Sequence, residues 1–156
     1  FPGFLLAIAL VAVLGPSLNN LIFAMCITGW AGYARLIRAE VLHLKTRDYV
    51  DAARSLGSNP IRIVIFHIWP NLVGPLVVQA TFGMAGTIIT ESGLSFLGLG
   101  APPTEPTWGG LLNAGRRSLI EAPHMSVFPG IAILLLVLGF NLFGDGLRDI
   151  LDPKKT

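Results

Sequence analysis

Charged side chains are scarce in this sequence of 156 residues, because Asp, Glu, Lys and Arg together make up only 13%. Average soluble domains carry about twice that fraction. Hydrophobic residues reach 53%, and the mean hydropathy is +0.68. A soluble domain of this size could not bury so much apolar surface in one core. The shortage of charge therefore argues against a soluble domain and predicts a chain that lies in lipid.

Cysteine is almost absent, since Cys26 is the only one. A single thiol excludes an intramolecular disulfide, and no CxxC pair or Cys/His zinc spacing occurs. Cys26 stands in an apolar run, so we expect an inert, buried thiol. The three histidines, His43, His67 and His124, are scattered without ligand spacing, and we expect no metal site.

Two catalytic motifs are also missing. No Gly-Lys-Ser/Thr follows the glycines at 93, 98 and 100, so the sequence has no phosphate-binding loop for ATP. Residues 93–97 (GLSFL) fall one residue short of a hydrolase nucleophile elbow, and His124, which could serve as a base, stands in another segment. We therefore predict no catalytic residues, no cofactor bound by this chain and no enzymatic activity.

Long charge-free runs are what the sequence has instead. They predict an all-α, polytopic membrane helix bundle with about four spans, at residues 1–14, 18–34, 71–90 and 127–144. Turn formers at 15–17 and 19–20 separate the first two spans. Residues 101–126 are rich in Pro and Gly and are expected to form a loop.

The start of the sequence predicts a truncated chain. Phe1 lies inside an apolar run, without an initiator Met or the basic n-region of a signal peptide. We therefore expect residues 1–156 to be the C-terminal part of a single transmembrane domain.

The basic residues predict the orientation of the spans. The loop 35–67 and the tail after residue 144 hold nine of the 11 Lys and Arg residues, whereas residues 101–126 hold two. Successive spans alternate sides, so this loop and the tail share one side, which the positive-inside rule makes cytoplasmic. The C-terminus at Thr156 is then cytoplasmic, and residues 101–126 are extracytoplasmic.

Within the loop 35–67, residues 47–57 (RDYVDAARSLG) have the pattern of a short amphipathic helix. One small, mildly apolar face is predicted from residues that recur at spacings of three and four, namely Tyr49, Ala52, Ala53 and Leu56. Gly57 suits a helix end in the left-handed conformation. Asn59 as an N-cap and Pro60 in the first turn predict that a new helix starts there.

These residues carry a resemblance. The run Asp51-Ala52-Ala53, followed by Gly57 and by Ile68-Trp69-Pro70, resembles the EAA loop of ABC importer permeases. Segments 67–71 (HIWPN), 91–112 (ESGLSFLGLGAPPTEPTWGGLL) and 128–153 (FPGIAILLLVLGFNLFGDGLRDILDP) resemble the dipeptide/oligopeptide/nickel branch, of the subunit type ending in GDGLRD-LDP. The similarity covers nearly the whole chain. It departs from the family pattern at Asp51 (for Glu), Trp69 (for Leu) and His67 (where many members have Ile).

The resemblance implies a transport subunit in a bacterial or archaeal plasma membrane, with a path for peptides or a related small solute such as chelated nickel. It implies that an ATPase-coupling loop contains Tyr49, Asp51, Ala52, Ala53, Leu56, Gly57 and Pro70. The implied partners are a second homologous permease, two ABC ATPase subunits that use the ATP, and an extracytoplasmic solute-binding protein, with no nucleic acid. The cargo stays open among dipeptides, oligopeptides, glutathione-like compounds and nickel complexes.

Polar residues within the spans are candidates for a translocation path, because an unpaired polar group is costly in hydrocarbon. They are Gln79, Asn141 and, at the outer end of the third span, Glu91. Hydrogen bonding between helices is the alternative role, and for each residue taken alone it is the favoured one. An autonomous channel or secondary transporter is the alternative function. Such proteins are expected to have charged coupling residues in the membrane, and only Glu91 approaches that description.

Overall fold

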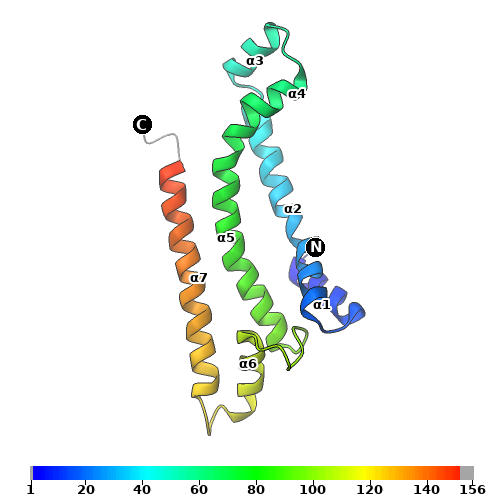
Figure 1. The fold of residues 1–156 in the computed structure, drawn as a ribbon, viewed down its shortest axis with the longest axis vertical. Coiled ribbons are helices and arrows are strands. Elements are labelled where there is room, and N and C mark those ends of the chain that lie inside the picture. Colours follow the sequence, from blue (N-terminus) through cyan, green and yellow to red (C-terminus); the bar gives the residue numbers. More distant parts are fainter. Residues whose placement is uncertain (1, 152–156) are drawn as a thin grey trace. The chain divides into compact units, whose positions relative to one another are not determined.

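The computed structural model describes residues 2–151, and within them every regular element is a helix (Figure 1). In chain order the elements are α1 (Gly3–Leu14), α2 (Leu18–Leu44), α3 (Asp48–Ser55), α4 (Pro60–Ile63), the π-helical turn η1 (Val64–Ile68), α5 (Trp69–Phe96), α6 (Trp108–Gly115), the 3₁₀ turn η2 (Arg116–Ser118) and α7 (His124–Leu151). The predicted all-α class is confirmed. Lys154, Lys155 and Thr156, which entered the predicted orientation, lie outside the described residues.

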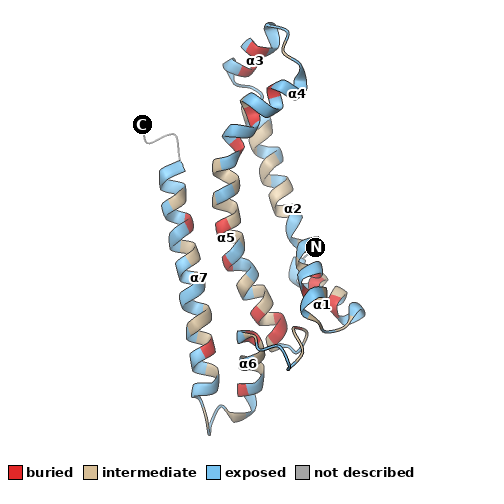
Figure 2. Ribbon diagram, viewed as in Figure 1, coloured by how far each residue is buried: buried red, intermediate tan, exposed pale blue. Residues whose placement is uncertain are grey.

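Three helical stretches are long and apolar enough to cross a membrane, namely Leu18–Leu44, Pro60–Phe96 and His124–Leu151. In the most apolar 18-residue segment of each stretch, only 11%, 17% and 11% is buried within the described chain. Figure 2 accordingly shows most of the helix surfaces as exposed or intermediate. Aliphatic surface of this extent is stable only when lipid or other protein covers it, as in a membrane bundle.

The first predicted span, residues 1–14, corresponds to α1, a shorter apolar helix of 12 described residues. About 20 residues are needed to cross the hydrocarbon core of a bilayer. The described residues therefore contain three helices of membrane length where about four spans were expected. The predicted turn after α1 is present. The side-chain amide of Asn20 donates to the carbonyls of Leu14 and Gly15, at 2.8 Å and 3.0 Å.

Two sequence-based boundaries differ from the structure. Helix α2 continues ten residues past the predicted end of its span at residue 34, through Arg35 and Arg38 to Leu44. Charge ends a hydrophobic run, but Arg and Glu are good helix formers, so the helix itself does not stop. Helix α6 lies inside the predicted loop 101–126. The prediction for Cys26 was wrong, because its side chain is exposed on α2 rather than buried.

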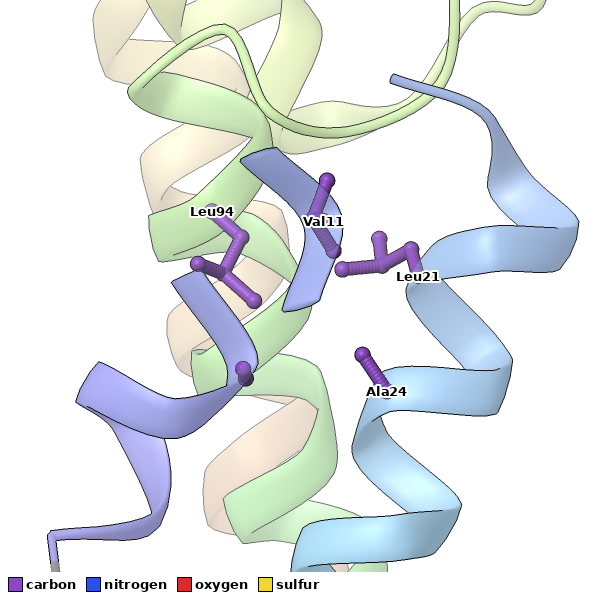
Figure 3. Close-up of a cluster of buried hydrophobic side chains, with 5 residues drawn as sticks. Val11, Leu21, Ala24 and Leu94 are labelled. Atoms are coloured by element: carbon purple, nitrogen blue, oxygen red, sulfur yellow. The ribbon is translucent and has the colours of Figure 1, made fainter. Parts of the chain in front are cut away.

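The described chain divides into two compact units. Unit 1 contains residues 2–30 and 82–142, and its core joins α1, α2 and α5. Figure 3 shows Val11 of α1 between Leu94 of α5 and Leu21 of α2, and all three side chains are fully buried. This small cluster is completed by Ala7 and Ala24.

Unit 2 contains residues 31–81 and 143–151. It therefore includes the second part of α2, the elements α3, α4 and η1, and the first part of α5. Its core consists of the buried residues Val50, Ala53, Ile63, Ile68 and Leu72. Three side chains of α2 (Ile37, Val41 and Leu44) pack against this core, which fixes the short helices of the loop to the longer ones.

Candidate partner-docking site

Helix α3 begins directly after Arg47, whose backbone is extended, and its first turn carries Asp48 and Asp51. Arg54 lies in the last turn. Acidic residues near the start and a basic residue near the end both suit the helix dipole. Arg54 also donates to Asp51 at 3.0 Å. Local chemistry thus explains the helix that the sequence predicted at these positions.

The turn after α3 depends on Gly57, which has a φ of +77°. The N–H of Gly57 donates to the carbonyl of Arg54 at 3.0 Å, and the N–H of Ser58 donates to that of Ala53 at 3.1 Å. This pair of bonds is a Schellman cap, which requires a left-handed residue at its centre. The predicted left-handed helix end is confirmed.

The next helix starts as its sequence predicts. The side-chain oxygen of Asn59 accepts from the N–H of Ile61 at 3.0 Å, and Pro60 occupies the first helical position. Proline is favoured there because that position has no intrahelical acceptor for an N–H. The Schellman cap at Gly57 and the N-cap at Asn59 therefore determine how the chain turns from α3 into α4.

The predicted face of α3 is divided in the structure. Ala53 is only 7% exposed and packs with Val50 in the core of unit 2. Tyr49, Ala52 and Leu56 are exposed, and Leu56 reaches 86%. The four residues predicted to share one face are therefore split, with Ala53 on the buried side of α3. An eight-residue helix must use one side to bury its own loop, and Val50 and Ala53, three residues apart, form that side.

The remaining residues of the predicted coupling loop are Asp51, within α3, and Pro70, within α5. Asp51 is exposed beside Arg54, and Pro70 is exposed in the first turn of α5, directly after η1. Proline has no N–H, and its ring crowds the carbonyl four residues earlier, so a wider π turn before it relieves that crowding. Asn71 donates its side-chain amide to the carbonyl of His67, which lies within η1, at 2.7 Å.

The three candidates for a translocation path fall into different units. Gln79 belongs to unit 2, whereas Glu91 and Asn141 belong to unit 1, and all three are partly buried. The carboxylate of Glu91 accepts from the hydroxyl of Ser95 at 2.6 Å and from that of Ser92 at 3.4 Å. Bonds within its own helix therefore stabilise Glu91, and a role in a path stays a prediction for all three residues.

Sequence reasoning missed the close packing of α6 on the end of α5 in unit 1. A Cβ atom at Gly109 would lie 2.6 Å from the backbone oxygen of Ser92. Asn113 donates its side-chain amide to the carbonyl of Phe96, and the guanidinium carbon of Arg116 lies 5.9 Å from the centroid of the Phe96 ring. The signal for α6 was Thr107, whose hydroxyl accepts from the N–H of Gly110 at 3.0 Å as an N-cap.

Comparison with known proteins decides the family. Residues 1–156 match the family described as "Binding-protein-dependent transport system inner membrane component". The chain belongs to this family. The resemblance to ABC importer permeases, which the loop and the C-terminal segments predicted, is thereby confirmed.

Individual relatives are similar over nearly all of the chain. It is 50% identical over 154 residues to "Glutathione transport system permease protein GsiD" of Escherichia coli O1:K1 / APEC, and equally to the protein of that name from Shigella flexneri serotype 5b (strain 8401). The match covers 99% of this chain and 51% of each relative. The chain therefore spans about half the length of the curated relatives it matches. These relatives are named as permeases, and the family is one of inner membrane components, which fits the exposed apolar helices.

Proposed function

We propose that this permease chain is part of a membrane-spanning subunit of an ABC importer, and that α3 with the turn after it docks on an ATPase subunit. The observation that carries the proposal is the construction of α3. Its inner side is anchored by Val50 and Ala53, while Ala52 and Leu56 point outward. The buried side of α3 fixes the helix in place, and Leu56 at its C-terminal end is 86% exposed. An exposed apolar side chain on a fixed helix is suited to contact a protein partner.

The chemistry of the outward face suits a groove in another protein. Leu56 supplies an apolar anchor, and the small Ala52 allows close approach of a partner's backbone. The excess of basic residues in the loop 35–67 supports a cytoplasmic location for this face by the positive-inside rule, on the side where ATP is available. The chain has no phosphate-binding loop, so ATP is used by two partner ATPases. A second homologous permease and an extracytoplasmic solute-binding protein complete the proposed complex.

We propose a peptide or a related small solute as the cargo. The relatives are named as glutathione transport permeases, and glutathione is a short peptide. Chelated nickel remains within the same proposed class. The subunit offers two states of the pathway, whose balance ATPase dimerisation biases through α3. Gln79, Glu91 and Asn141 are the proposed polar contacts along that path.

Site-specific photo-crosslinking in native membranes tests the docking face. A photo-reactive residue at position 56 of the full-length protein is expected to crosslink to a nucleotide-binding chain. The matched control is position 50, which is fully buried beneath the same helix and is expected to give no such product. Equal products from both positions, or none from position 56 in membranes that contain the ATPases, would contradict the proposal.

A further inference from the structure

One aromatic contact joins α3 to the turn that leads into α5. The rings of Tyr49 and His67 are stacked, with their centroids 6.5 Å apart and their planes inclined by 16°. Tyr49 is the second residue of α3, and His67 lies within η1. The pair therefore connects the exposed docking helix with the π turn that precedes α5, alongside the apolar core of unit 2.

The imidazole of His67 is an unexpected group in this position. Its Nδ1 atom is buried and has no hydrogen-bond partner among the described residues. A buried polar atom without a partner is destabilising, and an aliphatic side chain would fill the space without that cost. A role for the flat ring itself, as a stacking surface for Tyr49, accounts for its presence.

The segment that holds His67 is suited to change its conformation. Residues Val64–Ile68 form a π-helical turn between α4 and α5, both of which are α-helical. A π turn holds one residue more than an α turn, and such turns occur frequently at functional sites. Pro70 favours the wide turn, while the bond from Asn71 to the carbonyl of His67 keeps the chain helical. A shift between wide and normal turns would rotate the residues that precede α5 relative to those that follow.

We propose that Tyr49 and His67 form a clasp that transmits movement of α3 to η1, and thereby to α5. This inference rests on the proposed function, because it needs an ATPase that moves α3. Both residues act as positioning residues, since they hold the docking helix in register with the turn rather than contact ATP or cargo. Stacking is suited to this task because an aromatic pair with centroids about 4.5–7 Å apart is more stable than its buried area alone accounts for.

The test uses the full-length protein in its complete complex, reconstituted in lipid nanodiscs, with glutathione and a dipeptide as probe cargoes. The measurement is the ratio of cargo-stimulated to basal ATP hydrolysis, together with the stoichiometry of the co-purified subunits. Tyr49→Leu and His67→Leu are expected to lower this ratio by about two- to tenfold. This is the range that corresponds to the stabilisation free energy of one aromatic pair. Stoichiometry is expected to stay at the wild-type value.

Conservative variants separate the clasp from general disturbance of the loop. Tyr49→Phe and His67→Phe keep an aromatic pair and are expected to retain the wild-type ratio. The double variant Tyr49→Leu/His67→Leu is expected to be no worse than either single one, because both remove the same contact. Phe66→Leu is the matched control. Phe66 lies in the same turn, but its ring is 67% exposed and faces Arg62 instead, at 5.8 Å from the guanidinium carbon.

The outcomes distinguish the clasp from the proposed function. A wild-type ratio in both leucine variants, a loss in Tyr49→Phe equal to that in Tyr49→Leu, or loss of the ATPases from the leucine complexes would overturn the clasp alone. A wild-type complex without nucleotide-binding chains, or without stimulation by either probe, would overturn the proposed function and the role of the clasp with it.

Discussion

Two helices of this chain end in the same cap, yet the two turns have different surroundings. After α3 the left-handed residue is Gly57, with φ +77°, and after α5 it is Gly98, with φ +82°. The backbone bonds after Gly98 repeat the pattern around Gly57. The N–H of Gly98 donates to Ser95 at 3.0 Å, and that of Leu99 donates to Leu94 at 2.9 Å. Local geometry alone therefore does not distinguish the two turns.

What differs is the space around each turn. A Cβ atom at Gly57 would meet nothing within 4 Å among residues 2–151. The chain after Gly98 instead folds back on α5, and a Cβ at Gly100 would lie 1.8 Å from the hydroxyl of Ser95. Gly109 of α6 touches the same helix. The turn around Gly57 is therefore open, and we call it the elbow. The turn after α5, where Gly100 and Gly109 approach that helix, is packed, and we call it the joint. We infer that the elbow serves movement and the joint serves stability.

The largest effect is expected from Gly109→Ala, which tests the packed joint. The added methyl group would lie 2.6–2.7 Å from backbone atoms of Ser92, and a helix backbone cannot yield as a side chain can. Overpacking of this kind costs about 1–3 kcal/mol or more, so the full-length protein should unfold at a clearly lower temperature. Thermal unfolding in detergent measures the effect.

Gly86→Ala is the matched control for that experiment. It lies in α5, also in unit 1, and a Cβ there meets nothing within 4 Å in the described chain. Alanine favours a helix over glycine by about 0.5–1 kcal/mol. Unfolding of Gly109→Ala at or above the temperature of Gly86→Ala would show that the joint is not tightly packed.

Gly57→Val tests the elbow and is expected to have the second largest effect. A left-handed residue with a Cβ costs about 1–2 kcal/mol, and a β-branched one costs more. The helices of membrane length should be unaffected, so the complex should reach the membrane but lose cargo-stimulated ATP hydrolysis and uptake. Gly57→Asn, which tolerates positive φ, should keep much of the coupling. Normal coupling in the valine variant would mean that the elbow has no part in transmission.

The contrast between the turns also shows which features the sequence could predict. The helix at 47–57, its left-handed end at Gly57 and the cap at Asn59 follow from interactions within a few residues, and all three were predicted. Ala53 was predicted to share a face with Ala52 and Leu56, and it does not, because its burial depends on Ile63, Ile68 and Leu72, which lie farther along the chain. The spacing of apolar residues within α3 does not show which side of the helix these later residues will pack against.

The packed joint was missed for a related reason. Gly109 stands in the stretch 101–126, which its Pro and Gly content predicts to be a loop when only neighbours in sequence are considered. Its use as a contact point between α6 and α5 depends on the chain folding back on α5, which no short pattern encodes. Family resemblance, by contrast, was predictable because the matching segments extend over nearly the whole chain, and the family match covers all of it.

Leu56→Ala is expected to have an intermediate effect, confined to docking. The side chain is 86% exposed, so its loss should change the free energy of unfolding by less than about 0.5 kcal/mol. If Leu56 is buried by an ATPase, the lost contact is worth about 1.5–3 kcal/mol, which is tenfold or more in affinity. Titration of detached ATPase onto the reconstituted permease measures it. Val50→Ala, at a fully buried site, should show the reverse, a loss of stability first.

The smallest effect is expected from Asp51→Asn, which removes the ion pair on α3. Both side chains of the pair with Arg54 are 61% exposed, so the pair contributes about 0–1 kcal/mol and is screened by salt. If the elbow is held by its backbone bonds and by Gly57, the variant should unfold within about 4 °C of the wild type. It should also lose less coupling than Gly57→Val. Melting curves at low and high salt, with ATP hydrolysis measured in parallel, give both readouts. A loss of coupling as large as that of Gly57→Val, together with an unchanged melting temperature, would mean that Asp51 contacts the partner directly rather than only supporting α3. The open elbow would then be only one of two elements that the ATPase requires.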